Sequence, residues 1–300
     1  MNAETLIART PNLQAPSPTV TRLLTLLNNP EADYDDITTT VGRDAVLSAK
    51  VLAVCNSAGY GLAQPVASID QAVLYLGYGE IHRQVMVLSF GGQIAAALPG
   101  YDMEAGALWR HSLVTALLAP RVLARSKVAG PDPSIAYTAG LVHDIGKLVI
   151  GQTLDAAART EIRRRVEEDG IALLEAEHGV VGCDHAEIGA TLLRSWRLPE
   201  IIVEAVADHH RPKTDGTGPL AAVVHVADAI AHQSGASPGW ESFAVVRHES
   251  AITALGLAPA ELEFIALEAM DCLDQMSRQE NAGSANSSTA RAPAGLARTT

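Results

Sequence analysis

The segment ALWRHSLVTALLAPRVLARS, residues 107–126, restricts the fold of this chain more than any other feature. It is apolar on nearly every side of a helix, which predicts a central helix buried by its neighbours. Pro120 lies inside the segment and cannot donate to the carbonyl four residues back, so we expect a kink there or a helix end shortly before. A helix of this kind needs a shell of other elements around it.

Those other elements are also expected to be helices. The chain is 48% hydrophobic but only 4% aromatic, and it is rich in Ala, Leu and Val, a mixture that favours close helix packing over a sheet. Segments with helical apolar spacing, such as DAVLSAKVLAVCNSAGYG and SIDQAVLYLGYG, are separated by glycine-containing turns. The sequence therefore predicts an all-α fold.

Breaks in the apolar pattern divide the 300 residues into five parts. We expect the boundary between two helical subdomains at PGYD, residues 99–102. The end of the chain, NAGSANSSTARAPAGLARTT, has no packing face and is predicted to be disordered. The predicted parts are an N-terminal tail (1–12), an N-terminal helical subdomain (13–98), a second helical subdomain (103–235), a C-terminal helical extension (236–280) and a disordered tail (281–300).

The charge balance argues against nucleic acid as a direct partner. The formal net charge is −12, which repels a phosphate backbone unless a basic patch is segregated. The only dense basic run, Arg163 to Arg165, is flanked by Glu161, Glu167 and Glu168 on one expected helix.

Localisation follows from what the sequence does not contain. The start, MNAETLIARTPNLQ, has no basic segment followed by an apolar core, and no run of eighteen uncharged apolar residues occurs. Cys55, Cys183 and Cys272 are far apart and form no CxxC pair, as expected for buried thiols in a reducing compartment. We expect a soluble cytoplasmic protein without a membrane partner.

A set of histidines and aspartates is distributed over the predicted helices of the second subdomain. Imidazole nitrogen and carboxylate oxygen together suit divalent Mn, Fe or Zn, and ligands on several helices let a bundle build a preformed cage. A carboxylate such as that of Asp144 can bridge two ions, so the centre can be dinuclear. The candidate metal ligands are His111, His143, Asp144, His185, His209, His210 and Asp228.

Each candidate also has an interpretation without metal. His111 can be a hydrogen-bonded core residue, and a His-Asp dipeptide such as residues 143–144 is weak evidence alone. Asp184 and Glu187 resemble a helix-capping pair, which explains Asp184 but not His185; in the first turn of a helix an imidazole stays neutral and fit to bind metal.

The last candidates have alternatives of their own. His209 and His210 end an apolar helix, where they can interact with its dipole. Asp228 lies on an otherwise apolar segment, where an unpaired carboxylate is costly. His225, three residues earlier, can neutralise it without any metal.

The ordered set and its surroundings resemble the HDOD domain, a bacterial signalling relative of the HD-GYP phosphodiesterases within the HD superfamily of metal-dependent phosphohydrolases. The resemblance runs from about residue 13 to 233. It is carried by LLTLLNNP, GRDAVLSAKVLAVCNSAGYG, ASIDQAVLYLG, LWRHSLVTALLA, AGLVHDIGKLVI, GCDHAEIGATLLRSWRLPEIIVEAVADHH and VVHVADAIA, in that order.

The resemblance implies an N-terminal helical subdomain packed on an HD-like subdomain, and a role in signal transduction. Signalling proteins would dock on the N-terminal subdomain. In catalytic relatives the matching residues hold one or two ions, which activate a water against a phosphodiester, with Lys147 near a substrate phosphate and Asp144 as a catalytic ligand. A nucleotide or phosphate is then a candidate ligand.

One loop departs from the catalytic relatives. HD-GYP enzymes carry HHExxDGxGYP, whereas this chain reads HHRPKTDGTGPL: Arg211 replaces the glutamate, one residue is added before the DG pair, and the tyrosine is missing. We therefore expect a non-catalytic regulatory or partner-binding module with an HD-type pocket. The alternative is a metal-dependent phosphohydrolase that acts on a cyclic dinucleotide or another phosphate ester, because the ligand order is intact.

Overall fold

The computed structural model describes residues 1–29, 31–213, 218–237 and 248–289 of the chain. Within these ranges it contains helices and one isolated antiparallel β-bridge, between Leu98 and Met103, and no strand. The predicted all-α class is confirmed. The elements are α1 (Ala3–Ala8), α2 (Pro18–Leu27), α3 (Tyr34–Gly42), α4 (Ala45–Cys55), α5 (Ile69–Leu76), α6 (Tyr78–Ile94), the 3-10 helix η1 (Pro99–Tyr101), α7 (Ala107–Arg125), α8 (Pro133–Val142), α9 (Gly146–Thr153), α10 (Ala156–Glu167), α11 (Leu173–Val181), α12 (His185–Ser195), α13 (Glu200–Asp208), α14 (Pro219–Gln233), α15 (Glu249–Leu255) and α16 (Pro259–Thr289).

Short polar side chains determine where many of these helices begin, because each accepts a hydrogen bond from a backbone N–H of the first turn. The capping residues are Asn2, Asp33, Asp44, Ser68, Asp132, Asp155 and Asp184. Asp184 and Glu187 form a complete capping box, as their spacing predicts.

Helix α7 continues through Pro120 to Arg125, so the helix end expected before that proline is wrong. The helix packs against both α8 and α14. Burial between these two neighbours outweighs the lost backbone hydrogen bond and the clash of the proline ring with the carbonyl four residues earlier, which are the local reasons for a helix to end here.

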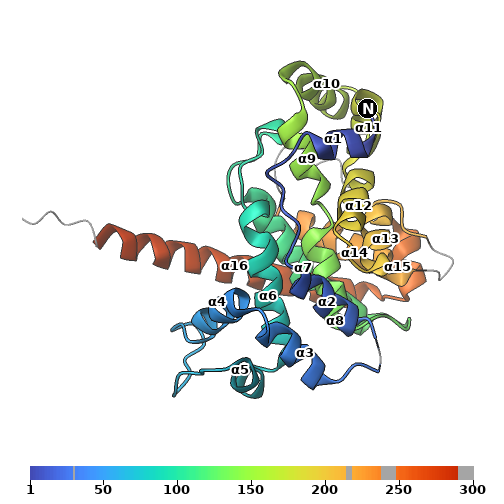
Figure 1. Cartoon of the computed structure of the whole chain (residues 1–300). Helices are drawn as coiled ribbons and strands as arrows, with labels where there is room; N and C mark the ends of the chain where they lie inside the picture. The colour runs from blue at the N-terminus through green and yellow to red at the C-terminus, as the bar shows by residue number, and fades with distance from the viewer. Residues whose placement is uncertain (30, 214–217, 238–247, 290–300) are drawn as a thin grey trace, which may run out of the picture.

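The helices form two packed groups (Figure 1). Helices α2 to α6 make the N-terminal subdomain, and α7 to α14 make the second subdomain above and beside it. The two groups meet where α6 packs on α7 and α8, and where α2 packs on α8. Tyr78 Oη donates to Asp132 Oδ2 at 2.9 Å across this interface, and His82 Nε2 lies 3.2 Å from Thr138 Oγ1.

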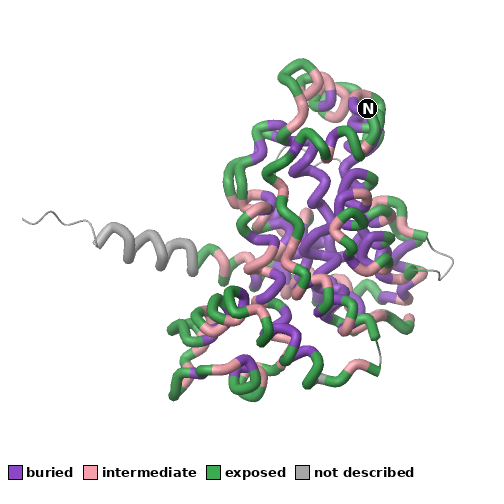
Figure 2. The backbone as a smooth tube through the Cα atoms, in the orientation of Figure 1, coloured by how far each residue is buried: buried purple, intermediate pink, exposed green. Residues whose placement is uncertain are grey.

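The densest packing lies in the second subdomain. Helix α8 is buried from Ser134 to Val142 and α14 from Leu220 to Ala231, which Figure 2 shows as the purple centre of the molecule. A β-carbon at Gly140 would lie 2.9 Å from the Cα of Ala116, so α8 approaches α7 as closely as backbones allow.

The two ends of the chain differ from expectation. The predicted N-terminal tail contains α1, whose fully buried Leu6 packs in the core while the helix lies against α12. Helix α16 continues to Thr289, so residues 281–289 are helical instead of disordered. Residues 238–247 of the predicted extension and 290–300 of the predicted tail lie outside the described residues. The local sequence shows neither the surface on which Leu6 packs nor the extension of α16 beyond its packed part.

In the described parts of the chain, none of the helices alone is long and apolar enough to cross a membrane. The bent pair α15 and Pro259–Arg278 of α16, with a 104° break, meets that criterion jointly by length and composition only.

Candidate metal centre

The His-Asp dipeptide occupies the break between two buried helices. His143 follows the last residue of α8, Asp144 comes next, and α9 begins at Gly146. A β-carbon at Gly146 would overlap the carbonyl oxygen of His185, so only glycine allows α9 to lie this close to the start of α12. This contact brings Asp144 and His185 together although they are far apart in the chain.

The carboxylate of Asp144 faces imidazole nitrogens on both sides. Its Oδ1 lies 3.3 Å from His185 Nε2 and 3.8 Å from His209 Nε2. Its Oδ2 lies 3.3 Å from His143 Nε2 and 3.7 Å from His111 Nε2. The two oxygens therefore point to two separate groups of nitrogen donors.

Asp228 provides a second carboxylate at the far side of His111 and His143. Its Oδ1 lies 3.0 Å from His111 Nε2 and 3.7 Å from His143 Nε2. Asp144 and Asp228 are both only 1% exposed. All seven ligands predicted from the sequence thus converge on one buried cluster, with His210 Nε2 placed 3.0 Å from His185 Nε2.

Four of the rings are held by their outer nitrogen. The Nδ1 atoms of His111, His143 and His209 lie 2.7 to 2.9 Å from the backbone carbonyls of Ala236, Gly140 and Val206, in that order. His185 Nδ1 lies 2.8 Å from Glu177 Oε2. A carbonyl or an ionised carboxylate can only accept, so each Nδ1 carries the proton and donates. When the ring is neutral, each Nε2 then carries a lone pair that points into the cluster.

This arrangement leaves electron-rich atoms facing one another. The Nε2 atoms of His111 and His143 are 3.2 Å apart. Buried atoms without a hydrogen-bond partner include Asp144 Oδ1, His209 Nε2 and both oxygens of Asp228. Buried polar atoms are normally paired, so a divalent cation between these donors is the simplest way to satisfy them.

The donors form overlapping groups in which the ligand atoms lie within 4.8 Å of one another. One group contains Asp144, His185, His209 and His210, a second contains His111, His143 and Asp144, and a third contains His111, Asp228 and His232. The residues therefore fit divalent ions with mixed imidazole and carboxylate ligands.

The protonation equilibria reflect the crowding of charge. Burial alone would lower the pKa of His143, but the carboxylates of Asp144 and Asp228 outweigh it and raise that pKa to about 10, so without a cation a proton on His143 Nε2 takes the place that a metal ion would otherwise fill. Burial, and then the neighbouring His143, lower the pKa of His209 to about 3. Desolvation opposes ionisation of Asp144, yet His143 and Lys147 hold its pKa well below the usual range. The carboxylates stay charged and require positive charge nearby.

Lys147 contributes part of that charge. Its Nζ lies 2.7 Å from Asp144 Oδ2, and the residue is 2% exposed. Asp144 lies three residues before Lys147, in the turn that leads into α9, and this spacing places the two side chains together. The lysine contacts the carboxylate itself, and its expected role beside a substrate phosphate stays a prediction.

Two residues of the site were missed by sequence reasoning. Glu177 is fully buried on α11; its Oε2 accepts from His185 N at 2.9 Å as well as from the ring, and its Oε1 accepts from Tyr101 Oη at 2.6 Å. No local pattern marks this glutamate. His232 carried a signal, because it lies one helical turn after Asp228 and so on the same face.

The alternative that His225 neutralises Asp228 is not supported by contacts. His225 Nδ1 donates to the carbonyl of His209 at 2.8 Å, and its Nε2 accepts from His248 N at 2.9 Å. Both ring nitrogens are therefore committed to the backbone, and His225 joins the end of α13 to the start of α15.

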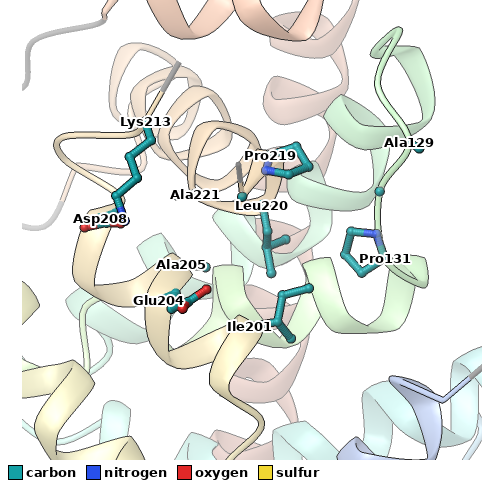
Figure 3. A pocket seen from close by; sticks show the side chains of 12 residues that line it. Ala129, Pro131, Ile201, Glu204, Ala205, Asp208, Lys213, Pro219, Leu220 and Ala221 are labelled. Atoms are coloured by element: carbon teal, nitrogen blue, oxygen red, sulfur yellow. The ribbon is translucent and has the colours of Figure 1, made fainter. Parts of the chain in front are cut away.

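A pocket of about 270 Å³ lies between α13, the start of α14 and residues 129–131 (Figure 3). Ile201, Leu220 and Pro131 give it apolar walls, and Glu204 and Asp208 give it acidic groups. Of the residues described around it, Lys213 is the only cation, and its Nζ lies 3.0 Å from Asp208 Oδ2. This lining does not favour a phosphate ligand.

The fold and the cluster together define an all-helical protein with an HD-type set of histidines and aspartates. Residues 13–212 match the HDOD domain, and the chain belongs to the HDOD domain family.

Solved structures agree with this fold. An HDOD domain protein of unknown function from Geobacter sulfurreducens is 24% identical, with a TM-score of 0.68 over 91% of this chain and 94% of that one. A candidate phosphohydrolase from Shewanella amazonensis is 26% identical, with a TM-score of 0.62 over 90% of this chain and 97% of that one.

Curated relatives match over part of their length. An uncharacterised protein from Treponema pallidum is 27% identical over 190 residues, and ribonuclease Y from Acholeplasma laidlawii is 26% identical over 186 residues. The matched segments cover 61% and 62% of this chain but only 35% and 28% of those two proteins.

Proposed function

We propose that this chain is an HDOD signal-transduction protein that works as a non-catalytic regulatory module and holds divalent metal in its second subdomain. One observation carries the metal centre: the inward Nε2 atoms of four histidines converge on two buried carboxylates, of which Asp144 Oδ1 and both oxygens of Asp228 have no hydrogen-bond partner. Such a cluster is strongly unfavourable without a cation.

Two subsites that share Asp144 account for the ligands. His185, His209 and His210 would hold an ion on one side of the carboxylate, and the remaining predicted ligands, His111, His143 and Asp228, would hold an ion on the other. A bound Mn, Fe or Zn ion would supply Lewis acidity. The chain's own residues orient the rings, exclude water and keep both carboxylates ionised.

Three features support a regulatory rather than a catalytic role. The side chains of His111, His143, His185, Asp144 and Asp228 are at most 1% exposed, so the ions would be enclosed. Lys147 pairs with Asp144. Arg211 stands where the catalytic loop of HD-GYP enzymes has glutamate; residues 214–217 of that loop lie outside the described residues.

Metal analysis and unfolding test the proposal together. Protein purified without chelator should contain Mn, Fe or Zn, and removal of the metal should lower the unfolding temperature. Restored metal at one hundred times its dissociation constant should add about 2.7 kcal/mol of stability. Asp144→Asn should abolish this gain, while Asp70→Asn, at an exposed position of α5, should keep it. Metal-free protein with no response to added metal contradicts the centre.

A second candidate function is a metal-dependent phosphohydrolase. It is favoured by the complete ligand set and by the likeness to the Shewanella amazonensis protein. Turnover of a cyclic dinucleotide or a simple aryl phosphodiester by the Mn- or Fe-loaded protein, lost in His143→Ala with Asp144→Ala, would establish it. Metal-loaded protein without turnover leaves the regulatory role.

Signalling partners are proposed to dock on the N-terminal subdomain. Large apolar side chains are exposed there: Leu74 at 81% and Tyr75 at 62% on α5, and Val46 at 68% on α4. Leu74 and Tyr75 are neighbours in the chain, and exposed apolar patches often mark protein–protein contact sites.

A further inference from the structure

His232 lies at the edge of the cluster and is not part of the predicted ligand set. It projects from the same face of α14 as Asp228, four residues earlier. Its Nε2 lies 3.4 Å from Asp228 Oδ1, and its ring centroid lies 4.4 Å from that of His111. The side chain is only 4% exposed. His232 therefore faces the inside of the cluster, not solvent.

Among the described residues, none donates a hydrogen bond to the carboxylate of Asp228. Both oxygens are buried without a hydrogen-bond partner. The nearest donor atom, His111 Nε2 at 3.0 Å, is the lone-pair side of that ring, because His111 Nδ1 donates to the carbonyl of Ala236. A lone pair and a carboxylate at this separation repel unless a cation lies between them.

The turn that follows α14 supports both rings. Gly235 adopts a φ of +96°, a left-handed conformation that glycine allows, and the chain turns back at this point. The next residue, Ala236, holds His111, and Ser237 Oγ lies 2.9 Å from His232 Nδ1. A partner on the outer nitrogen is the usual support of a metal-bound histidine.

We propose that His232 is a direct ligand of a divalent transition-metal ion that it shares with His111 and Asp228. The ligand atoms of the three residues lie within 4.8 Å of one another. Two imidazoles and one carboxylate favour Mn, Fe, Co or Zn over Mg or Ca. The inference rests on the proposed metal centre and adds a nitrogen ligand to one of its two subsites.

The competing role for His232 is to donate a hydrogen bond from Nε2 to Asp228, and two substitutions separate the roles. His232→Gln keeps an N–H donor near the position of Nε2 but is a poor ligand. His232→Glu keeps a good ligand, cannot donate, and places a second carboxylate beside Asp228. A ligand role therefore predicts tighter metal binding by His232→Glu than by His232→Gln, and a donor role predicts the reverse.

The experiment is a calorimetric titration of the chelator-treated full chain with Co²⁺, together with the visible spectrum of the bound ion. For His232→Gln we expect one ion to bind about tenfold more weakly or not at all, with altered absorption bands. His232→Glu should keep the wild-type stoichiometry. Ser237→Ala should weaken the same ion less than His232→Gln does, and Asp70→Asn, at an exposed position of α5, should bind as the wild type does.

The outcomes distinguish this inference from the function on which it rests. Wild-type protein that binds no Co²⁺ overturns the metal centre and the ligand role of His232 together. Wild-type binding that His232→Gln leaves unchanged, or that His232→Glu weakens more than His232→Gln, overturns the His232 assignment alone. Circular dichroism of each apo variant checks folding. If His232→Gln does not fold, the Co²⁺ stoichiometry of His232→Glu decides: the wild-type stoichiometry supports the ligand role, and loss of one ion overturns it.

Discussion

Helix α8 in the second subdomain is buried from Ser134 to Val142, whereas α5 in the N-terminal subdomain buries only Ile69 and Ala72 among its residues (Figure 2). This difference in burial agrees with the function proposed for each subdomain, metal binding in the second and partner docking in the N-terminal one. A cage of ligands from several helices must be held to within a fraction of an ångström, and dense packing does this. A docking surface needs exposed apolar side chains, which a thin helical layer provides.

The largest expected effect comes from the closest helix contact of the second subdomain. Gly146→Ala should lower the free energy of unfolding by about 3 kcal/mol, because the new β-carbon meets the backbone carbonyl of His185, which cannot move without shifting α12. Urea unfolding measures the change. It should also weaken metal binding, since the same shift separates His185 from Asp144.

A glycine of the N-terminal subdomain is the matched control. Gly92 lies in α6, and a β-carbon added there would have no neighbour within 4 Å, so Gly92→Ala should leave stability unchanged or raise it by up to about 1 kcal/mol. Equal losses in the two variants would show that the subdomains do not differ in packing tightness.

Glu177→Gln should lower the free energy of unfolding by about 2 kcal/mol. The amide presents a donor where the carboxylate accepted hydrogen bonds from the backbone and ring of His185 and from Tyr101. Metal affinity should fall about 10- to 100-fold as the His185 ring loses its support. Tyr101→Phe removes one hydrogen bond. It should lower the free energy of unfolding by about 1 kcal/mol and leave metal affinity nearly unchanged. A purely structural glutamate would change stability and leave affinity intact.

His82 makes the subdomain interface sensitive to pH. Burial, opposed by Asp132 and reinforced by Arg83, lowers the pKa of His82 to about 3. The unfolded value is near 6.5, so the unfolded chain takes up the proton first, and stability falls as the pH drops below 6.5. At pH 5.5 the loss is about 1.4 kcal/mol.

The variant His82→Gln isolates the contribution of His82 to the pH dependence of stability. We expect the wild type to lose about 1.4 kcal/mol more than His82→Gln between pH 7.5 and pH 5.5, both measured by urea unfolding with the same bound metal. The metal-site histidines titrate alike in both proteins and cancel in the difference. Parallel pH profiles would show that His82 is not held neutral at the interface.

The smallest effect on stability is expected on α5. Leu74→Ser should change the free energy of unfolding by no more than about 0.5 kcal/mol, since its side chain is 81% exposed. It should nevertheless reduce capture of signalling proteins in quantitative cross-linking. Leu267→Ser on α16, where the side chain is 61% exposed, is the control. Loss of partners from Leu267→Ser but not from Leu74→Ser would place the docking surface elsewhere.

Much of the site was predictable because its signals are local. The order of His111, His143, Asp144 and the later ligands can be read along the chain, and the structure brings all of them together. The capping box of Asp184 and Glu187 is a four-residue pattern and was found. Glu177 could not be found this way, because its partners, His185 and Tyr101, come from other elements.

The amino-acid pattern by itself determined the helical class, the buried central helix and the identity of the candidate ligands, because helical periodicity and side-chain chemistry act over a few residues. Only the tertiary structure decided that α7 passes Pro120, that α1 docks on α12, that His225 turns to the backbone and that His232 turns to Asp228. These outcomes depend on burial and on contacts between distant segments, which no local pattern contains.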